Sequence, residues 1–199
     1  VRLIMQDGIN NNTNYQFNSN YNNYTYMYYS NSNVKTTLEN WYQTNIGSKA
    51  DLAKNVASGN YYCEQAKQKR ADSYTSGSAT MTTYNKYTPN FKCSTDSNGK
   101  GQVNASIGLI SYDEVVYAGG YPYQNNSNYY LYDSTINWWT MSPAGFSSID
   151  SCIWRIYNTG NIANDGSNFT DVVRPITVIK DDTQILSGTG TSSNPYVIN

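Results

Sequence analysis

The stretch from Trp138 to the end of the chain most constrains the fold. It contains five short runs of alternating or aromatic residues, separated by turn sequences such as Asn158-Thr159-Gly160. Short runs of this kind between turns are typical of β-strands. We expect Trp138, Trp139 and Trp154 to anchor the core, because large aromatic rings in short strands normally pack inside. With three runs upstream, the predicted strands are residues 1–5, 107–110, 129–132, 138–141, 152–157, 172–179, 184–186 and 196–198.

Two helix starts are indicated by capping boxes, in which a Ser or Thr and a Glu three residues later each bond the other's backbone amide. The first is Thr36-Thr37-Leu38-Glu39, and the apolar spacing after it predicts a helix over residues 37–46, ended by Gly47. The second is Ser111-Tyr112-Asp113-Glu114, which follows a predicted strand at 107–110. The fold class is therefore predicted to be α+β, with a strand-rich carboxyl half.

Composition limits the class of protein and its partners. The 199 residues include 13 Lys or Arg and 14 Asp or Glu, without a long run of either sign, so nucleic acid and membrane contact are not expected. No apolar run approaches the ~20 residues that span a bilayer. With 21 tyrosines, 28 asparagines and only 14% charged residues, the chain is unlike a disordered one. We expect a single folded domain over residues 1–199.

The three cysteines indicate a disulfide and not a metal site. The chain has no Cys-x-x-Cys pair and no histidine, which excludes the usual zinc sites and every histidine-dependent catalytic triad. Cys63 and Cys93 each have aromatic neighbours and enclose a polar segment. We predict a bridge between them, worth about 3 kcal/mol by the loop-entropy model. Cys152, in an apolar run, is expected to be a buried free thiol.

No residue is predicted to be catalytic, and no metal or cofactor is expected. Carboxylate pairs can hydrolyse glycosides, and four aspartates are available in the carboxyl half. Each lies beside Ser, Thr, Gly or Asn, where capping a turn is the expected role. These aspartates are Asp133, Asp150, Asp165 and Asp171.

The order of several motifs in the carboxyl half carries a resemblance to a known family. Ile107-Gly108-Leu109-Ile110 is followed by Tyr117-Ala118-Gly119-Gly120, then Trp138-Trp139-Thr140-Met141-Ser142-Pro143, then Val173-Arg174-Pro175 and a Gly-Thr-Gly-Thr ending. This set resembles uncharacterised surface domains of Gram-positive (Firmicutes) gut bacteria, which are similar to C-type lectin-like and formylglycine-generating-enzyme-like folds. The resemblance covers most of the chain from about Thr36 onward.

The resemblance implies a twisted antiparallel sheet with two flanking helices and long loops, located outside the cell. It transfers no catalytic residue. The paired cysteines of formylglycine-generating enzymes are absent, as are the Glu-Pro-Asn and Gln-Pro-Asp sequences of sugar-binding C-type lectins. Some family members follow a pilin-like or membrane-anchoring helix. Since this chain begins without methionine inside a predicted strand, we expect it to be the carboxyl-terminal part of a longer surface protein.

Two segments concentrate tyrosine and asparagine. Residues 10–33, the amino-terminal tyrosine segment, hold ten asparagines and six tyrosines. They could be disordered, but residues 24–29 have the content of a strand or a tightly packed loop. Residues 121–130 form the central tyrosine segment. Rigid tyrosine rings among small polar residues are typical of antibody contact loops, although a merely solvated surface has the same composition.

These observations predict a non-enzymatic recognition or adhesion module of a bacterial surface or pilus-associated protein. Its expected partners are a host or cell-surface protein or a glycan. The alternative is a structural, pilin-like filament subunit whose tyrosine-rich faces pack against copies of itself. We expect both tyrosine segments to lie on one face. The candidate ligand-binding residues are Tyr21, Tyr24, Tyr26, Tyr28, Tyr121, Tyr123, Tyr129 and Tyr130.

Overall fold

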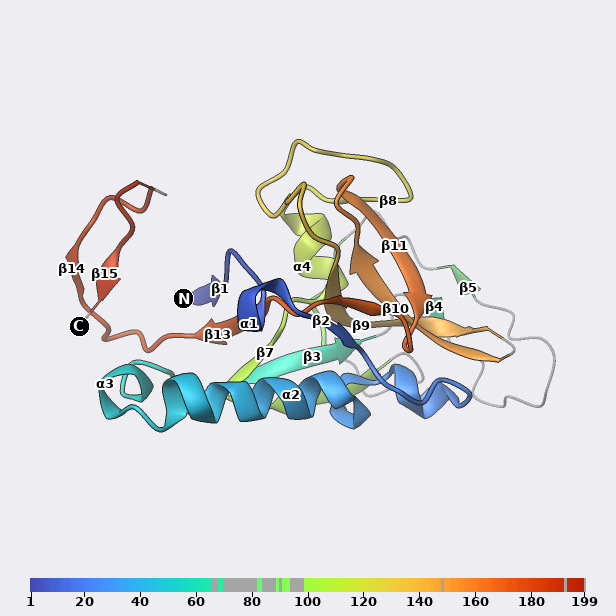
Figure 1. The fold of residues 1–199 in the computed structure, drawn as a ribbon, viewed down its shortest axis with the longest axis horizontal. Helices are drawn as coiled ribbons and strands as arrows, with labels where there is room; N and C mark the ends of the chain where they lie inside the picture. The colour runs from blue at the N-terminus through green and yellow to red at the C-terminus, as the bar shows by residue number, and fades with distance from the viewer. Residues whose placement is uncertain are drawn as a thin grey trace.

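A computed structural model describes residues 1–65, 68–69, 82–83, 89, 91–93, 99–147, 149–191 and 193–198. Within these residues the chain is a mixed α+β protein built mainly from sheets, as predicted (Figure 1). None of the helices described there is long and apolar enough to cross a membrane.

The largest sheet has six strands in the order β2-β12-β9-β10-β11-β8. Its centre is the antiparallel pair of β9 and β10, which meets at Ser147 and Asp150. The pairs β12–β9 and β11–β8 are parallel, so the sheet is mixed. The bounds are β2 (Asn14–Gln16), β8 (Tyr121–Pro122), β9 (Trp138–Ser147), β10 (Asp150–Ile156), β11 (Asn161–Gly166) and β12 (Thr170–Val172).

A three-stranded sheet brings the two ends of the chain together. Its order is β1-β13-β7, with β1 (Arg2–Ile4) and β7 (Ile107–Leu109) antiparallel to the central β13 (Pro175–Val178). The remaining strands form pairs: β3 (Tyr61–Gln65) with β6 (Gly99–Asn104), β4 (Gln68–Lys69) with β5 (Thr82–Thr83), and β14 (Ile185–Ser187) with β15 (Val197–Ile198).

The first long helix begins one turn earlier than predicted. Helix α2 (Asn33–Tyr42) is capped by Ser32, whose hydroxyl accepts the Lys35 amide at 3.0 Å, and it continues into a π-helical turn, η3 (Gln43–Gly47). The predicted capping box at Thr36 is therefore wrong. Glu39 instead pairs with Lys35 along the helix at 2.5 Å. The earlier start buries an additional apolar residue, Val34, on the face that also carries Leu38 and Tyr42.

The second predicted capping box is confirmed. The Ser111 hydroxyl accepts the Glu114 amide at 3.2 Å, while the Ser111 amide donates to the Glu114 carboxylate at 2.8 Å. Helix α4 (Tyr112–Tyr117) follows β7 as expected, and Gly119 after it has a φ of +101°. Four short helical turns complete the fold: α1 (Ile9–Asn12), η1 (Tyr24–Met27), η2 (Tyr29–Asn31) and α3 (Ala50–Ala53).

The tryptophans form the centre of the core, as predicted. Trp138, Trp139 and Trp154 are fully buried on β9 and β10. Trp139 meets the edge of the Phe17 ring at 5.8 Å between centroids, and Trp154 packs on Tyr112 of α4 at 4.6 Å. The helices and sheets therefore share one core.

Two predicted strands differ in the structure. Residues 129–132 form a turn, closed by a bond from the Tyr132 amide to the Tyr129 carbonyl at 3.1 Å. Residues 172–179 are split between β12 and β13 because the buried Arg174 interrupts them. Arg174 donates to the Met5 carbonyl at 3.2 Å and to the Leu131 carbonyl at 3.1 Å.

Candidate functional site: an aromatic-rimmed pocket beside the disulfide

The two tyrosine segments lie on different sides of the domain, so the predicted shared face is wrong. The amino-terminal segment enters the six-stranded sheet through β2, and the central segment enters through β8. These are the two opposite edge strands of that sheet. Figure 1 shows the loop after α4 above the sheets, while η1 lies with α2 on the other side.

The amino-terminal segment is ordered, and several of its rings belong to the core. Met27, Tyr28 and Tyr29 are buried, with Tyr28 only 2% exposed. Tyr28 therefore cannot be a surface contact in the folded protein, and its assignment as a ligand-binding residue is wrong. Tyr24 and Tyr26 are half-buried, whereas Tyr21 is 40% exposed.

Polar groups from other elements hold this segment in place. The Ser151 amide of β10 donates to the Tyr21 carbonyl at 2.7 Å, and the Ser151 hydroxyl donates to the Asn23 carbonyl. The buried Glu64 carboxylate of β3 accepts the Ser30 amide at 3.1 Å and the Ser30 hydroxyl at 3.3 Å. Residues 24–31 are therefore a tightly packed loop of short 3₁₀ turns, not a strand.

The central segment exposes most of its rings. Tyr121 and Tyr123 are 40% and 44% exposed, and Tyr130 is 87% exposed. Tyr123 is held from both sides: its ring lies 5.6 Å from Trp154, and its hydroxyl accepts the Asn164 side-chain amide at 2.9 Å. Tyr129 is half-buried, and its hydroxyl is buried. Three of these four candidates are therefore available to a partner.

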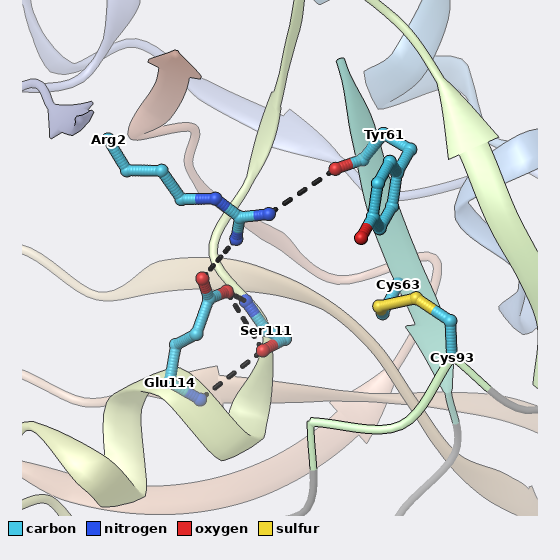
Figure 2. The surroundings of a disulfide bond; sticks show 6 residues. All are labelled: Arg2, Tyr61, Cys63, Cys93, Ser111 and Glu114. Atoms are coloured by element: carbon cyan, nitrogen blue, oxygen red, sulfur yellow. Dashed lines mark hydrogen bonds and ion pairs between the residues drawn. A yellow bond between two sulfur atoms is a disulfide. The ribbon is translucent and has the colours of Figure 1, made fainter. Parts of the chain in front are cut away.

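A pocket of about 260 Å³ lies at the start of α4, beside the disulfide. It is formed where β1, β3, β9 and the β7–α4 junction meet the segment around Cys93. Figure 2 shows several of its side chains converging near the sulfur atoms. The lining residues are Arg2, Tyr61, Cys63, Phe91, Ser111, Asp113, Glu114 and Ser142.

The disulfide fixes one wall of the pocket. Cys63 and Cys93 are bridged, as predicted, with their Cα atoms 5.0 Å apart. The bridge joins β3 to the segment that carries Phe91. Cys152 is not part of a disulfide, but it is half-buried and not fully buried as expected. It packs at the margin of the core, where its thiol lies 3.7 Å from the Asp150 carbonyl.

The charges at the base of the pocket are paired with one another. The Arg2 guanidinium donates to the Glu114 carboxylate and, at 3.3 Å, to the Tyr61 carbonyl (Figure 2). It also lies over the Tyr62 ring, 5.5 Å from the centroid. Burial raises the pKa of Tyr62 to about 12, although the adjacent Arg2 lowers it. Arg2 thus connects the first strand to α4 and β3.

The rim of the pocket is aromatic and exposed. Of the lining residues, Tyr61 is 45% exposed and Phe91 56%, and Phe91 meets a neighbouring ring, that of the 76% exposed Tyr117, edge to face at 5.6 Å. Sequence reasoning missed these three residues as a site. The available signal is the aromatic residues beside each cysteine, which in the sequence analysis support only the predicted bridge.

The chemistry of the pocket suits binding. The Ser142 hydroxyl accepts the Tyr112 amide at 2.9 Å, and the Ser111 hydroxyl caps α4, so both serines have structural roles. The chain has no histidine to activate either hydroxyl. Exposed rings above hydroxyl and carboxylate groups offer apolar area and polar contacts to a partner.

Two of the four candidate aspartates converge on one arginine. The buried Arg155 lies 2.8 Å from a carboxylate oxygen of Asp165 and 2.8 Å from one of Asp171. Its guanidinium is also 4.3 Å from the centroid of the Tyr157 ring. Burial raises the pKa of Asp171 to about 7. The positive charge of the neighbouring Arg155 acts in the opposite direction and lowers this pKa, but its effect is smaller than that of burial. This cluster links β10, β11 and β12 across the sheet.

Asp133 has the predicted turn-capping role, since its carboxylate accepts the Thr135 amide at 2.8 Å. Among the residues whose placement is described, no group of three His, Cys, Asp or Glu is arranged to hold a metal ion.

Comparison with known proteins gives no relative. No family model, no curated protein and no solved structure matches this chain.

Proposed function

We propose that residues 1–199 form a non-enzymatic, extracellular recognition or adhesion module of a bacterial surface or pilus-associated protein. Its partner is a host or cell-surface protein or a glycan. The observation that carries this proposal is the disulfide-fixed pocket, which is lined by the exposed Tyr61 and Phe91, with the exposed Tyr117 ring in contact with Phe91. Exposed, well-supported aromatic side chains beside a concavity are the usual anchors of protein recognition.

Within the α+β class, the fold that we propose is C-type lectin-like. Two features support it: strands from near the two ends of the chain, β1 and β13, pair antiparallel, and two helices flank the sheets (Figure 1). Long connections such as residues 123–137 lie between regular elements. The proposed extracellular location is supported by the Cys63–Cys93 disulfide, since disulfides persist in oxidising compartments.

The test is binding of the intact chain to a glycan array and to a panel of host surface proteins. Phe91→Ala and Tyr61→Ala should each weaken binding by about 1–2 kcal/mol, or roughly tenfold, if the pocket rim is the contact. Phe169→Ala is the matched control, because Phe169 is 54% exposed but does not line this pocket. Equal losses in all three variants, or no binding to any member of either panel, would contradict the proposal.

The central tyrosine segment is the second candidate contact. Tyr121→Ala and Tyr130→Ala in the same assay separate the two surfaces, because Tyr121 and Tyr130 do not line the pocket beside the disulfide. A loss confined to these variants would move the binding site to the loop after α4 and leave the function unchanged.

A filament subunit is a second proposal, and one observation favours it. The two tyrosine segments lie at opposite edges of the six-stranded sheet. A head-to-tail contact between identical subunits needs two different faces on each subunit. Electron microscopy of concentrated protein distinguishes this function, since regular filaments lost in Tyr130→Ala would support it.

A further inference from the structure

The last elements of the chain form a hairpin that stands apart from the rest of the domain. Within the described part of the chain, strands β14 and β15 pair only with each other, and Figure 1 shows them projecting beyond β13. From Thr183 to the end of the chain there is no charged side chain. A lone two-stranded hairpin is marginally stable in water, and a third strand or a packed face is normally needed. The hairpin therefore has the features of an element completed by a partner.

The hairpin also exposes large apolar side chains. Ile185 is 59% exposed, Leu186 63%, Tyr196 56% and Val197 50%. Single exposed apolar residues are ordinary, but four on one short hairpin form a patch of the kind that marks an interaction surface.

The two edges of the hairpin are not equivalent. Pro195 and Tyr196, which lead into β15, line a pocket of about 480 Å³ together with Leu3 and Ile4 of β1, so this side faces the body of the domain. Proline also has no amide to offer a further strand. Strand β14 is the outer strand in Figure 1. It carries none of the charges or prolines that natural proteins use to block edge pairing.

Leu186 is placed to contact a partner strand that adds to the edge of β14. The register between the strands shifts from Ile185 opposite Ile198 to Ser187 opposite Val197, so Leu186 is the extra residue of a bulge on β14. Its side chain has no cross-strand partner in the hairpin and remains the most exposed of the four.

The properties of this edge favour a second copy of the chain as its occupant. An interface with two-fold symmetry uses the same patch twice, so the patch must tolerate its own copy. A charged edge would repel itself, whereas this one is neutral, and the net charge of the whole chain is only −1. Two hairpins joined along β14 give four strands, which meets the minimum for a stable sheet.

We infer that β14 is a self-association surface, at which β14 of a second copy lies antiparallel and Ile185 and Leu186 of both copies pack together. This pairing closes on itself, so it produces a dimer and not a filament. It is independent of the pocket beside the disulfide and of any ligand.

The experiment is sedimentation of the intact chain over a wide range of concentrations. The wild type should pass from monomer to dimer. Leu186→Lys should raise the dimer dissociation constant roughly tenfold or more, since two like charges would meet at the contact. Leu52→Lys is the matched control, because Leu52 is 49% exposed on α3 and is not part of the hairpin, so it should leave the dissociation constant unchanged.

A cysteine variant adds a direct measurement. In an antiparallel pair of identical three-residue strands, the central residue lies nearest its own copy, so Leu186→Cys should form an intermolecular disulfide under mild oxidation and Leu52→Cys should not. A wild-type chain that stays monomeric at every concentration overturns the inference. So does a dimer that Leu186→Lys and Leu52→Lys affect equally.

Discussion

The amino-terminal and central tyrosine segments have similar compositions and different roles in the molecule. In the first, Tyr28 and Tyr29 are part of the core; in the second, Tyr121, Tyr123 and Tyr130 are exposed. The difference lies in what surrounds each segment. Residues 21–31 are bonded to β10 and to the buried Glu64, whereas the central segment follows the edge strand β8. Tyrosine content alone therefore does not distinguish a structural segment from a contact surface.

The largest expected effect comes from removing a core ring. Tyr29→Ala should lower the free energy of unfolding by about 3–5 kcal/mol, because the side chain is fully buried and its loss leaves a cavity. Tyr130→Ala, at 87% exposure, should change it by less than about 0.5 kcal/mol. Urea unfolding of both variants measures this contrast, and equal costs would remove the distinction between the segments.

The next effect concerns the anchor of the amino-terminal segment. Glu64→Ala should cost about 2–3 kcal/mol, since it leaves the Ser30 amide without its buried acceptor. Limited proteolysis should then cut within residues 21–31 sooner than in the wild type. Glu39→Ala is the control, because its ion pair with Lys35 is partly exposed and is worth only about 0.3–0.5 kcal/mol. Unchanged proteolysis in Glu64→Ala would show that the segment is held by ring packing alone.

A pH effect should appear where the amino-terminal segment joins the sheet, since Tyr15 of β2 is paired with Asp171 of β12. The folded-state pKa of Asp171, raised to about 7, lies above the ordinary value of 3.8. The folded state therefore binds this proton more tightly, and the resulting stability is present at low pH and lost as the pH rises to about 7.

The free energy of unfolding of the wild type, relative to Asp171→Asn, should therefore fall by about 2–3 kcal/mol between pH 5 and pH 8. Denaturant titrations of both proteins at each pH test this. A difference between the two proteins that does not vary with pH, or that grows as the pH rises, would contradict the raised pKa.

The smallest effect separates the ring of Tyr29 from its hydroxyl. Among the residues whose positions are described, none hydrogen-bonds to this hydroxyl, and burial raises its pKa above the ordinary tyrosine value. Tyr29→Phe should leave the free energy of unfolding unchanged, or raise it by less than about 1 kcal/mol. A clear loss of stability in this variant would reveal a partner for the hydroxyl.

Local patterns with a defined hydrogen-bond geometry were predictable from the sequence. The Ser111 capping box, the core tryptophans and the Cys63–Cys93 bridge are all present in the structure. The Thr36 box failed because Ser32 offers an equivalent hydroxyl one turn earlier, where the helix can also bury Val34. When two caps compete, tertiary packing decides between them.

The candidate site was less predictable because it depends on long-range contacts. Arg2 and Glu114 are 112 residues apart, and Phe91 reaches Tyr117 only because the bridge holds its segment beside β3. The placement of the residues around Tyr28 similarly depends on distant partners, Glu64 of β3 and Ser151 of β10. Composition identified the tyrosine segments, but it contained no information about which sheet edge each would join.

The Cys63–Cys93 bridge also has a consequence for how this protein can vary. The segment between the cysteines starts and ends at two Cα atoms that are 5.0 Å apart. A replacement segment of any length would meet the same two fixed ends, and lengthening a closed loop costs little, about 0.6 kcal/mol for each doubling. Foreign peptides could therefore be inserted for display between Gln65 and Phe91, where the insertion would keep both the buried Glu64 and the pocket residue Phe91 in the chain.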